Sequence, residues 1–223
     1  MKANALVFWM LLHTWVKSSL VGELRREMAL YAVATQPPKL FAIPEPPRLY
    51  VDAEGLVQSC PLFKACFQEC IRLHSTLISV RSIQRSFLAS ERSEDTPRGG
   101  RPKTYSMEAR SYVVTLLGVR VQSFKCDLYP EFFRPQKFIK EEKRIDGKRS
   151  GDGEGPNTWG VCPGKTIAEK ETFAFVAAIL ALWDFTPSHP SGWVVPGHSS
   201  SSVFAGPSND IRVVVRPREL PTA

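Results

Sequence analysis

The sequence lacks the cysteine pattern of a disulfide-stabilised protein or of a zinc site. Five cysteines are an odd number in a chain of 223 residues, and none of them stands in a C-x-x-C spacing. The four histidines are scattered, so each is expected to be an isolated polar residue rather than a metal ligand. We expect reduced thiols in a cytosol-facing protein, with Cys60, Cys66 and Cys70 as packing residues and Cys126 and Cys162 further along the chain.

A concentrated nucleic-acid-binding surface is also missing. The chain has 29 basic and 22 acidic residues, which gives a net charge of +7 spread along its length. The densest basic stretches, Arg98 to Lys103 and Lys137 to Arg149, contain glycine or proline and lack the interleaved aromatic residues of a nucleic-acid platform. We interpret them as solvated loops and expect no nucleic-acid partner.

No apolar run is long enough to span a bilayer. The run from Ala5 to Leu12 is too short, and His13 and Lys17 interrupt its extension. We expect two helices joined near Lys17, with the charged residues from Glu23 to Glu27 mostly facing water. An N-terminal signal anchor is the alternative, because a lysine precedes this apolar run.

The order of elements predicts a mainly helical α+β fold with short strands near the C-terminus. No internal repeat is visible, and turn-rich segments separate the periodic ones. The expected elements are a helix at 59–76, a β-like segment at 77–88, a strand pair around Gly118 at 111–121, a helix at 165–185 and short strands at 192–217.

Two motifs could carry chemistry. Glu69 and Arg72 stand three residues apart on the expected helix at 59–76, so they share a face and can pair, either as a buried pair or as an ordinary surface salt bridge. Cys162 is followed by Pro163 and Gly164 and then by helical sequence. At a helix N-terminus the free N–H groups and the dipole stabilise a thiolate, which suits iron or a nucleophilic role. A small buried thiol behind a turn is the open alternative.

The ordered set of these motifs closely resembles the C-terminal half of the cytochrome P450 family, in particular its filamentous-fungal members. Glu69 and Arg72 match the E-x-x-R pair, and Phe133 to Phe138 resembles the F-x-P-x-x-F loop. The residues that match the cysteine motif are Trp159, Gly160, Cys162, Pro163, Gly164, Ala168 and Glu171. The corresponding segments are the end of the central helix (1–16), the E-x-x-R helix (59–76), the irregular loop region (122–157), the haem-ligand loop and helix (158–186) and the C-terminal strands (192–217).

This resemblance implies a haem (heme b) whose iron is ligated axially by the thiolate of Cys162. It further implies that Arg81 binds a haem propionate and that Glu69 and Arg72 are structural. The implied activity is hydroxylation of a lipophilic small molecule, in fungal secondary metabolism, with an NADPH-dependent flavoprotein reductase as electron donor. Full-length relatives are anchored to the endoplasmic reticulum membrane.

The chain departs from the family pattern beside its cysteine. Only Val161 stands between Gly160 and Cys162, where the family has a glycine-rich stretch that is longer by about four residues and directs N–H groups at the sulfur. The family's N-terminal half, which shapes the substrate site, has no counterpart here. We therefore expect a truncated or diverged member with little activity of its own. A non-catalytic remnant or interaction protein that binds no haem is the alternative.

Overall fold

The computed structural model describes residues 3–38, 45–74, 78–91, 100–116, 132–136, 138–139, 165–199 and 205–222. Its helices are α1 (Ala3–Val16), α2 (Ser18–Glu27), α3 (Ala53–Ser59), α4 (Pro61–His74) and α7 (Lys165–Leu182). Its strands are β1 (Ala32–Thr35), β2 (Arg48–Val51), β3 (Ile78–Ser82), β4 (Phe87–Ser90), β5 (Thr104–Met107), β6 (Tyr112–Leu116), β7 (Trp183–Pro187) and β8 (Val213–Pro217). The prediction of an α+β fold is confirmed.

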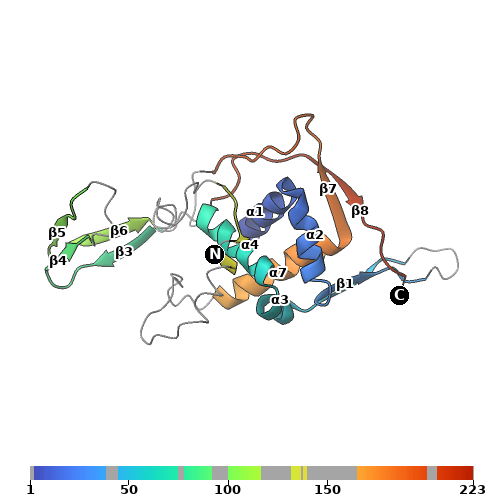
Figure 1. The fold of residues 1–223 in the computed structure, drawn as a ribbon, viewed down its shortest axis with the longest axis horizontal. Helices are drawn as coiled ribbons and strands as arrows, with labels where there is room; N and C mark the ends of the chain where they lie inside the picture. The colour runs from blue at the N-terminus through green and yellow to red at the C-terminus, as the bar shows by residue number, and fades with distance from the viewer. Residues whose placement is uncertain are drawn as a thin grey trace.

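The core lies between α1 and the helices that surround it. Helix α1 is apolar on most of its circumference, which suits a helix buried among others, and it packs against α2, α4 and α7 (Figure 1). Leu6, Trp9 and Met10 on α1 are fully buried, as are Phe63 on α4 and Phe173 on α7. The chain bends by 115° between α1 and α2, at the expected junction at Lys17. Within the described residues, no single helix is long and apolar enough to cross a membrane.

The first turn of α4 is capped by a side chain from α2. Pro61 begins α4, where a missing N–H costs nothing, and Cys60 before it has no oxygen to cap the helix. The carboxylate of Glu27 instead accepts hydrogen bonds from the N–H groups of Leu62 and Phe63, both at 2.8 Å. The expectation that Glu27 faces water is therefore wrong, because the packing of α2 against α4 partly buries this side chain.

Replacing Glu27 with alanine is expected to lower the free energy of unfolding by about 1–2 kcal/mol, the usual effect of losing a helix cap. The N–H groups of Leu62 and Phe63 would lose their acceptors at the start of α4. Urea unfolding of Glu27→Ala beside Glu23→Ala, a change on the same helix, measures the difference. Equal midpoints for the two variants would show that the cap contributes nothing.

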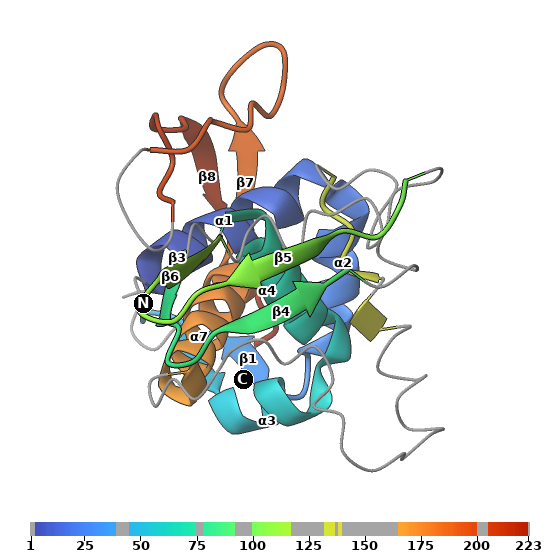
Figure 2. The ribbon, with the colours of Figure 1, turned by 90° about the vertical axis from the view of Figure 1, so that its left-hand side faces the viewer.

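Four antiparallel strand pairs accompany the helices, namely β1–β2, β3–β6, β4–β5 and β7–β8. The pairs β3–β6 and β4–β5 follow one another along an arm that stands away from the helices in Figure 1 and faces the viewer in Figure 2. The predicted β-like segment at 77–88 is thus divided between two strands. The first strand of the predicted pair at 111–121 is present as β6, which pairs with β3 across the arm; Gly118 and the predicted second strand lie outside the described residues.

Helix α7 ends three residues earlier than predicted, because Trp183 to Pro187 form β7 and pair with β8. Two arginines at this corner donate to the last carbonyls of α7, Arg25 to Leu180 and Arg218 to Leu180 and Ala181. These carbonyls would otherwise need further helical turns as hydrogen-bond partners. The long-range guanidinium contacts therefore allow the chain to leave the helix at Leu182.

Candidate functional site

The site is built on α4, where Glu69 and Arg72 form a buried, bidentate ion pair. Arg72 Nε donates to Glu69 Oε2 at 2.6 Å, and its Nη2 donates to Oε1 at 2.8 Å. The side chains are 0% and 2% exposed for Glu69 and Arg72, respectively. Spacing i, i+3 brings the two groups to one helix face, and the planar guanidinium fits the carboxylate with two parallel bonds. The alternative of a solvated surface salt bridge does not apply.

The same pair holds the backbone of the aromatic and proline-containing loop at 132–136. Arg72 Nη2 donates to the carbonyl of Phe132 at 3.1 Å, and the N–H of Arg134 donates to Glu69 Oε1 at 2.9 Å. Arg134 also lies over the Phe132 ring, with its Cζ 5.6 Å from the ring centroid. Both charges therefore use their spare hydrogen-bonding capacity on a segment that lies far away in the sequence.

Three histidines lie in a hydrogen-bonded row beside this pair. His13 Nε2 is 2.8 Å from His74 Nε2, and His74 Nδ1 is 2.7 Å from His198 Nε2. The expectation of isolated histidines is therefore wrong for these three, because α1, α4 and the C-terminal segment that contains His198 and Ala205 meet here. The row runs from His198, an exposed residue, to the buried His74 and His13.

Trp9 and Phe133 hold the histidine row between aromatic rings. The Trp9 ring stacks on His74 at 3.8 Å between centroids and 4° between planes, and Phe133 stacks on His13 at 4.4 Å and 1°. Trp9 Nε1 donates to the carbonyl of Ala205 at 2.7 Å, and the N–H of Ala205 donates to the carbonyl of His74 at 3.1 Å. The row thus joins α1 and α4 to the loop at 132–136 and to the C-terminal segment.

Burial keeps the imidazoles of His13 and His74 neutral near pH 7. It lowers the pKa of His13 to about 4, an effect partly opposed by the negative charge of Glu69. Burial lowers the pKa of His74 to about 2, reinforced by His13, His198 and the Arg72 charge. Neutral imidazoles can each donate and accept one hydrogen bond, which is what a continuous row requires.

The predicted site residues are described to different extents. Glu69 and Arg72 lie together, as described above. Arg81 lies on β3 in the arm, in register with Val113 of β6, and its side chain is outside the described set. Cys162 lies outside the described residues, three positions before the first residue of α7, Lys165. Within the described ranges, no group of three or more His, Cys, Asp or Glu side chains is arranged to hold a metal ion.

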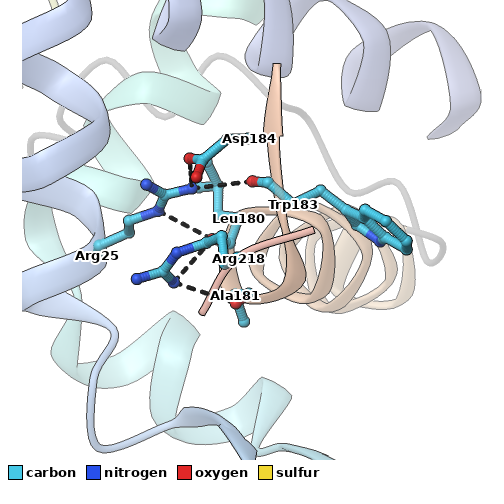
Figure 3. A network of polar contacts seen from close by, with 6 residues as sticks. All are labelled: Arg25, Leu180, Ala181, Trp183, Asp184 and Arg218. Carbon is cyan, nitrogen blue, oxygen red and sulfur yellow. Dashed lines mark hydrogen bonds and ion pairs between the residues drawn. The ribbon is translucent and has the colours of Figure 1, made fainter. Parts of the chain in front are cut away.

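Sequence reasoning missed Arg25, which was expected to face water. Its guanidinium donates to the carbonyls of Leu180 and Trp183, both at 2.9 Å, and to Asp184 Oδ1 at 2.7 Å (Figure 3). Only 19% of the side chain is exposed, because α2 lies beside the end of α7. The hydrophobic spacing of α2 gives no signal for a partner that follows more than 150 residues later.

Comparisons with known proteins agree with the architecture. No protein-family model matches the chain. The chain is 23% identical over 228 residues to the cytochrome P450 monooxygenase nodJ of Hypoxylon pulicicidum, with 95% of the chain and 40% of that protein covered. A crystal structure of a cytochrome P450 (CYP102L1) matches with a TM-score of 0.62, 17% identity and coverage of 97% of this chain and 42% of that one. A zebra fish cytochrome P450 solved with abiraterone matches with a TM-score of 0.60, 18% identity and coverage of 97% and 45%.

The chain therefore has a cytochrome P450 fold over the part that it spans, and the resemblance of its sequence to that family is confirmed. It spans about 40% of the length of the curated relative that it matches. The relative is a monooxygenase by name, and what this chain shares with the solved structures is the cytochrome P450 fold.

Proposed function

We propose that this chain is the haem-binding part of a cytochrome P450-like monooxygenase, with Cys162 as the axial ligand of the iron. The observation that carries the proposal is the fold match over 97% of the chain, combined with the cysteine motif directly before α7. A bound haem would supply the iron that inserts one oxygen atom of O₂ into a C–H bond of a lipophilic substrate, with electrons from a flavoprotein reductase.

The three cysteines that the structure describes are poor candidates for an iron ligand, which supports Cys162 in that role. Cys60, Cys66 and Cys70 are buried free thiols, and burial raises the pKa of each of them, to about 11 for Cys60. Thiols in such surroundings stay protonated and make poor iron ligands. Cys162 precedes the 18-residue helix α7 by three positions in the sequence, and in this proposal the helix dipole and free N–H groups favour its thiolate.

The chain's own residues contribute a buried frame that precedes that ligand in the sequence. In this proposal the Glu69–Arg72 pair fixes the loop at 132–136, which precedes the cysteine segment in the chain. The resemblance assigns a haem propionate to Arg81, whose guanidinium can bind a carboxylate with two hydrogen bonds. Substrate selection falls to the part of the P450 fold that this chain does not span.

The short segment between Gly160 and Cys162 favours weak haem binding by the chain alone, since few backbone N–H groups can reach the sulfur. We expect the chain mixed with haemin to give a ferrous–CO spectrum without a stable thiolate-ligated Soret band. Adding a glycine-rich insert of about four residues before Val161, and supplying the N-terminal half of a relative, should produce that band.

Two cysteine variants make the test specific. Cys162→Ser should abolish the band in the completed protein, whereas Cys126→Ser should leave it unchanged. A strong band from the unmodified chain that Cys162→Ser removes would show that the short segment is competent. If the completed protein gives no band, the alternative holds, and the chain is a remnant that binds no haem and acts, if at all, through its surface.

A further inference from the structure

A cavity of about 200 Å³, open to solvent on one side, lies at the C-terminal end of α7. It is lined by the end of α2, by β1, by the last turn of α7 and by residues 218–221. Its lining residues are Arg25, Met28, Ala29, Ala32, Val33, Ala34, Ala181, Arg218, Glu219, Leu220 and Pro221. Four of these residues are alanines, whose small side chains leave the space open between two arginines and an apolar wall.

The two arginines each keep hydrogen-bonding capacity for a ligand. Arg25 uses Nε and Nη2 on carbonyls and on Asp184, and Arg218 uses Nη1 on the carbonyls of Leu180 and Ala181. In the described part of the chain, Arg25 Nη1 and Arg218 Nη2 have no partner. Figure 3 shows the two guanidinium groups next to each other, each with a terminal nitrogen directed away from α7.

Two arginines and two carboxylates, Asp184 and Glu219, surround the cavity, so the two nitrogens act as directed hydrogen-bond donors and not through a net positive charge. Asp184 pairs with Arg25 and is 47% exposed on its side chain, whereas Arg218 has no ion pair among the described residues. Glu219 lines the cavity without pairing with either arginine. Burial lowers the pKa of Arg218, and the neighbouring Arg25 charge lowers it further, against a smaller opposite effect of Asp184. The guanidinium groups also donate to the last carbonyls of α7, at the negative end of the helix dipole.

We propose that this cavity binds a small organic carboxylate, whose oxygens accept hydrogen bonds from Arg25 Nη1 and Arg218 Nη2. The short apolar body of the ligand packs on Ala29, Ala34 and Ala181. Arginine pairs suit carboxylates because each planar guanidinium offers directed donors. A cavity of about 200 Å³ is smaller than a typical drug-sized site, so the ligand has only a few carbon atoms. Carboxylate binding at this site does not depend on whether the chain binds haem.

Titration of the full chain with sodium butyrate tests the proposal, read from the arginine Nε–Hε signals in nuclear magnetic resonance spectra. The signals of Arg25 and Arg218 should shift to saturation with butyrate and should not respond to uncharged butyramide. Butyrate should bind more tightly than inorganic phosphate, which has the charge without the apolar body. Equal responses to butyrate and butyramide, equal affinity for butyrate and phosphate, or no saturable shift would each overturn the proposal.

Variants separate binding from folding. Arg218→Gln should weaken butyrate binding at least about tenfold, the usual effect of losing a hydrogen bond to a charged group, whereas Arg212→Gln on the exposed tail should not. Ala29→Leu leaves both arginines intact and narrows the cavity from a surface position, so it should also weaken binding while the chain stays folded. Unchanged affinity in Ala29→Leu would contradict the assignment of the ligand to this cavity.

Discussion

Replacing Arg72 with alanine should lower the free energy of unfolding by about 3–5 kcal/mol, the range measured when one member of a buried ion pair is removed. Glu69 is fully buried, so its carboxylate would lose both guanidinium bonds without access to water. The carbonyl of Phe132 would also lose the hydrogen bond that Arg72 donates to it, which weakens the attachment of the loop at 132–136 to α4. The expected effect is therefore larger than that of any surface ion pair in the described chain.

The pair Glu45–Arg48 provides a matched control, because it has the same i, i+3 spacing with Arg48 74% exposed. Exposed pairs typically contribute less than about 1 kcal/mol, so Arg48→Ala should change the urea midpoint only slightly. Arg72→Lys is informative as well, because it keeps the charge but cannot make both bonds to Glu69. If Arg72→Ala shifts the midpoint no more than Arg48→Ala does, the buried pair has no special role in stability.

How much of this site could be predicted depends on the sequence separation of its contacts. Spacing three on one helix was enough to predict that Glu69 and Arg72 can pair, because helix geometry is local. The histidine row could not be predicted in this way, since its hydrogen bonds join residues 61 and 124 positions apart. The row exists only because α1 and the C-terminal segment pack on either side of α4.

The error in the predicted end of the helix at 165–185 also comes from contacts between residues far apart in the sequence. The segment from Lys165 to Phe185 is rich in helix formers, so its intrinsic preference gives no reason to stop at Leu182. The reason lies in β8 and in the two arginines that take the last carbonyls of α7. The α+β fold class, in contrast, follows from the order of apolar periodic segments and was predicted correctly.

Acidification from pH 7 to pH 5 should destabilise the folded chain, and His13 should account for about 2 kcal/mol of the loss. In the unfolded chain His13 takes up a proton near its ordinary pKa of 6.5, whereas burial lowers the pKa to about 4 in the folded protein. The unfolded state therefore binds more protons as the pH falls below 6.5. The loss grows down to about pH 4, and above pH 7 the histidine contributes no pH dependence.

His74 adds to the same fall in the free energy of unfolding with decreasing pH. Burial lowers its pKa to about 2, so its contribution continues to grow at lower pH than that of His13. The variant His13→Gln keeps a side chain that can donate and accept a hydrogen bond but does not titrate. Its free energy of unfolding should fall less between pH 7 and pH 5 than that of the parent chain, by about 2 kcal/mol. Urea unfolding at several pH values measures this difference.

The exposed His189 supplies the comparison, since among the described residues its ring hydrogen-bonds to Ser191 and is not part of the buried row. His189→Gln should follow the pH profile of the parent chain. If His13→Gln follows that profile too, His13 is not held neutral by burial, and the row of neutral imidazoles between Trp9 and Phe133 does not persist in solution. If the free energy of unfolding falls less between pH 7 and pH 5 in His13→Gln but not in His189→Gln, the acid sensitivity of the fold originates where His13 of α1 packs against α4.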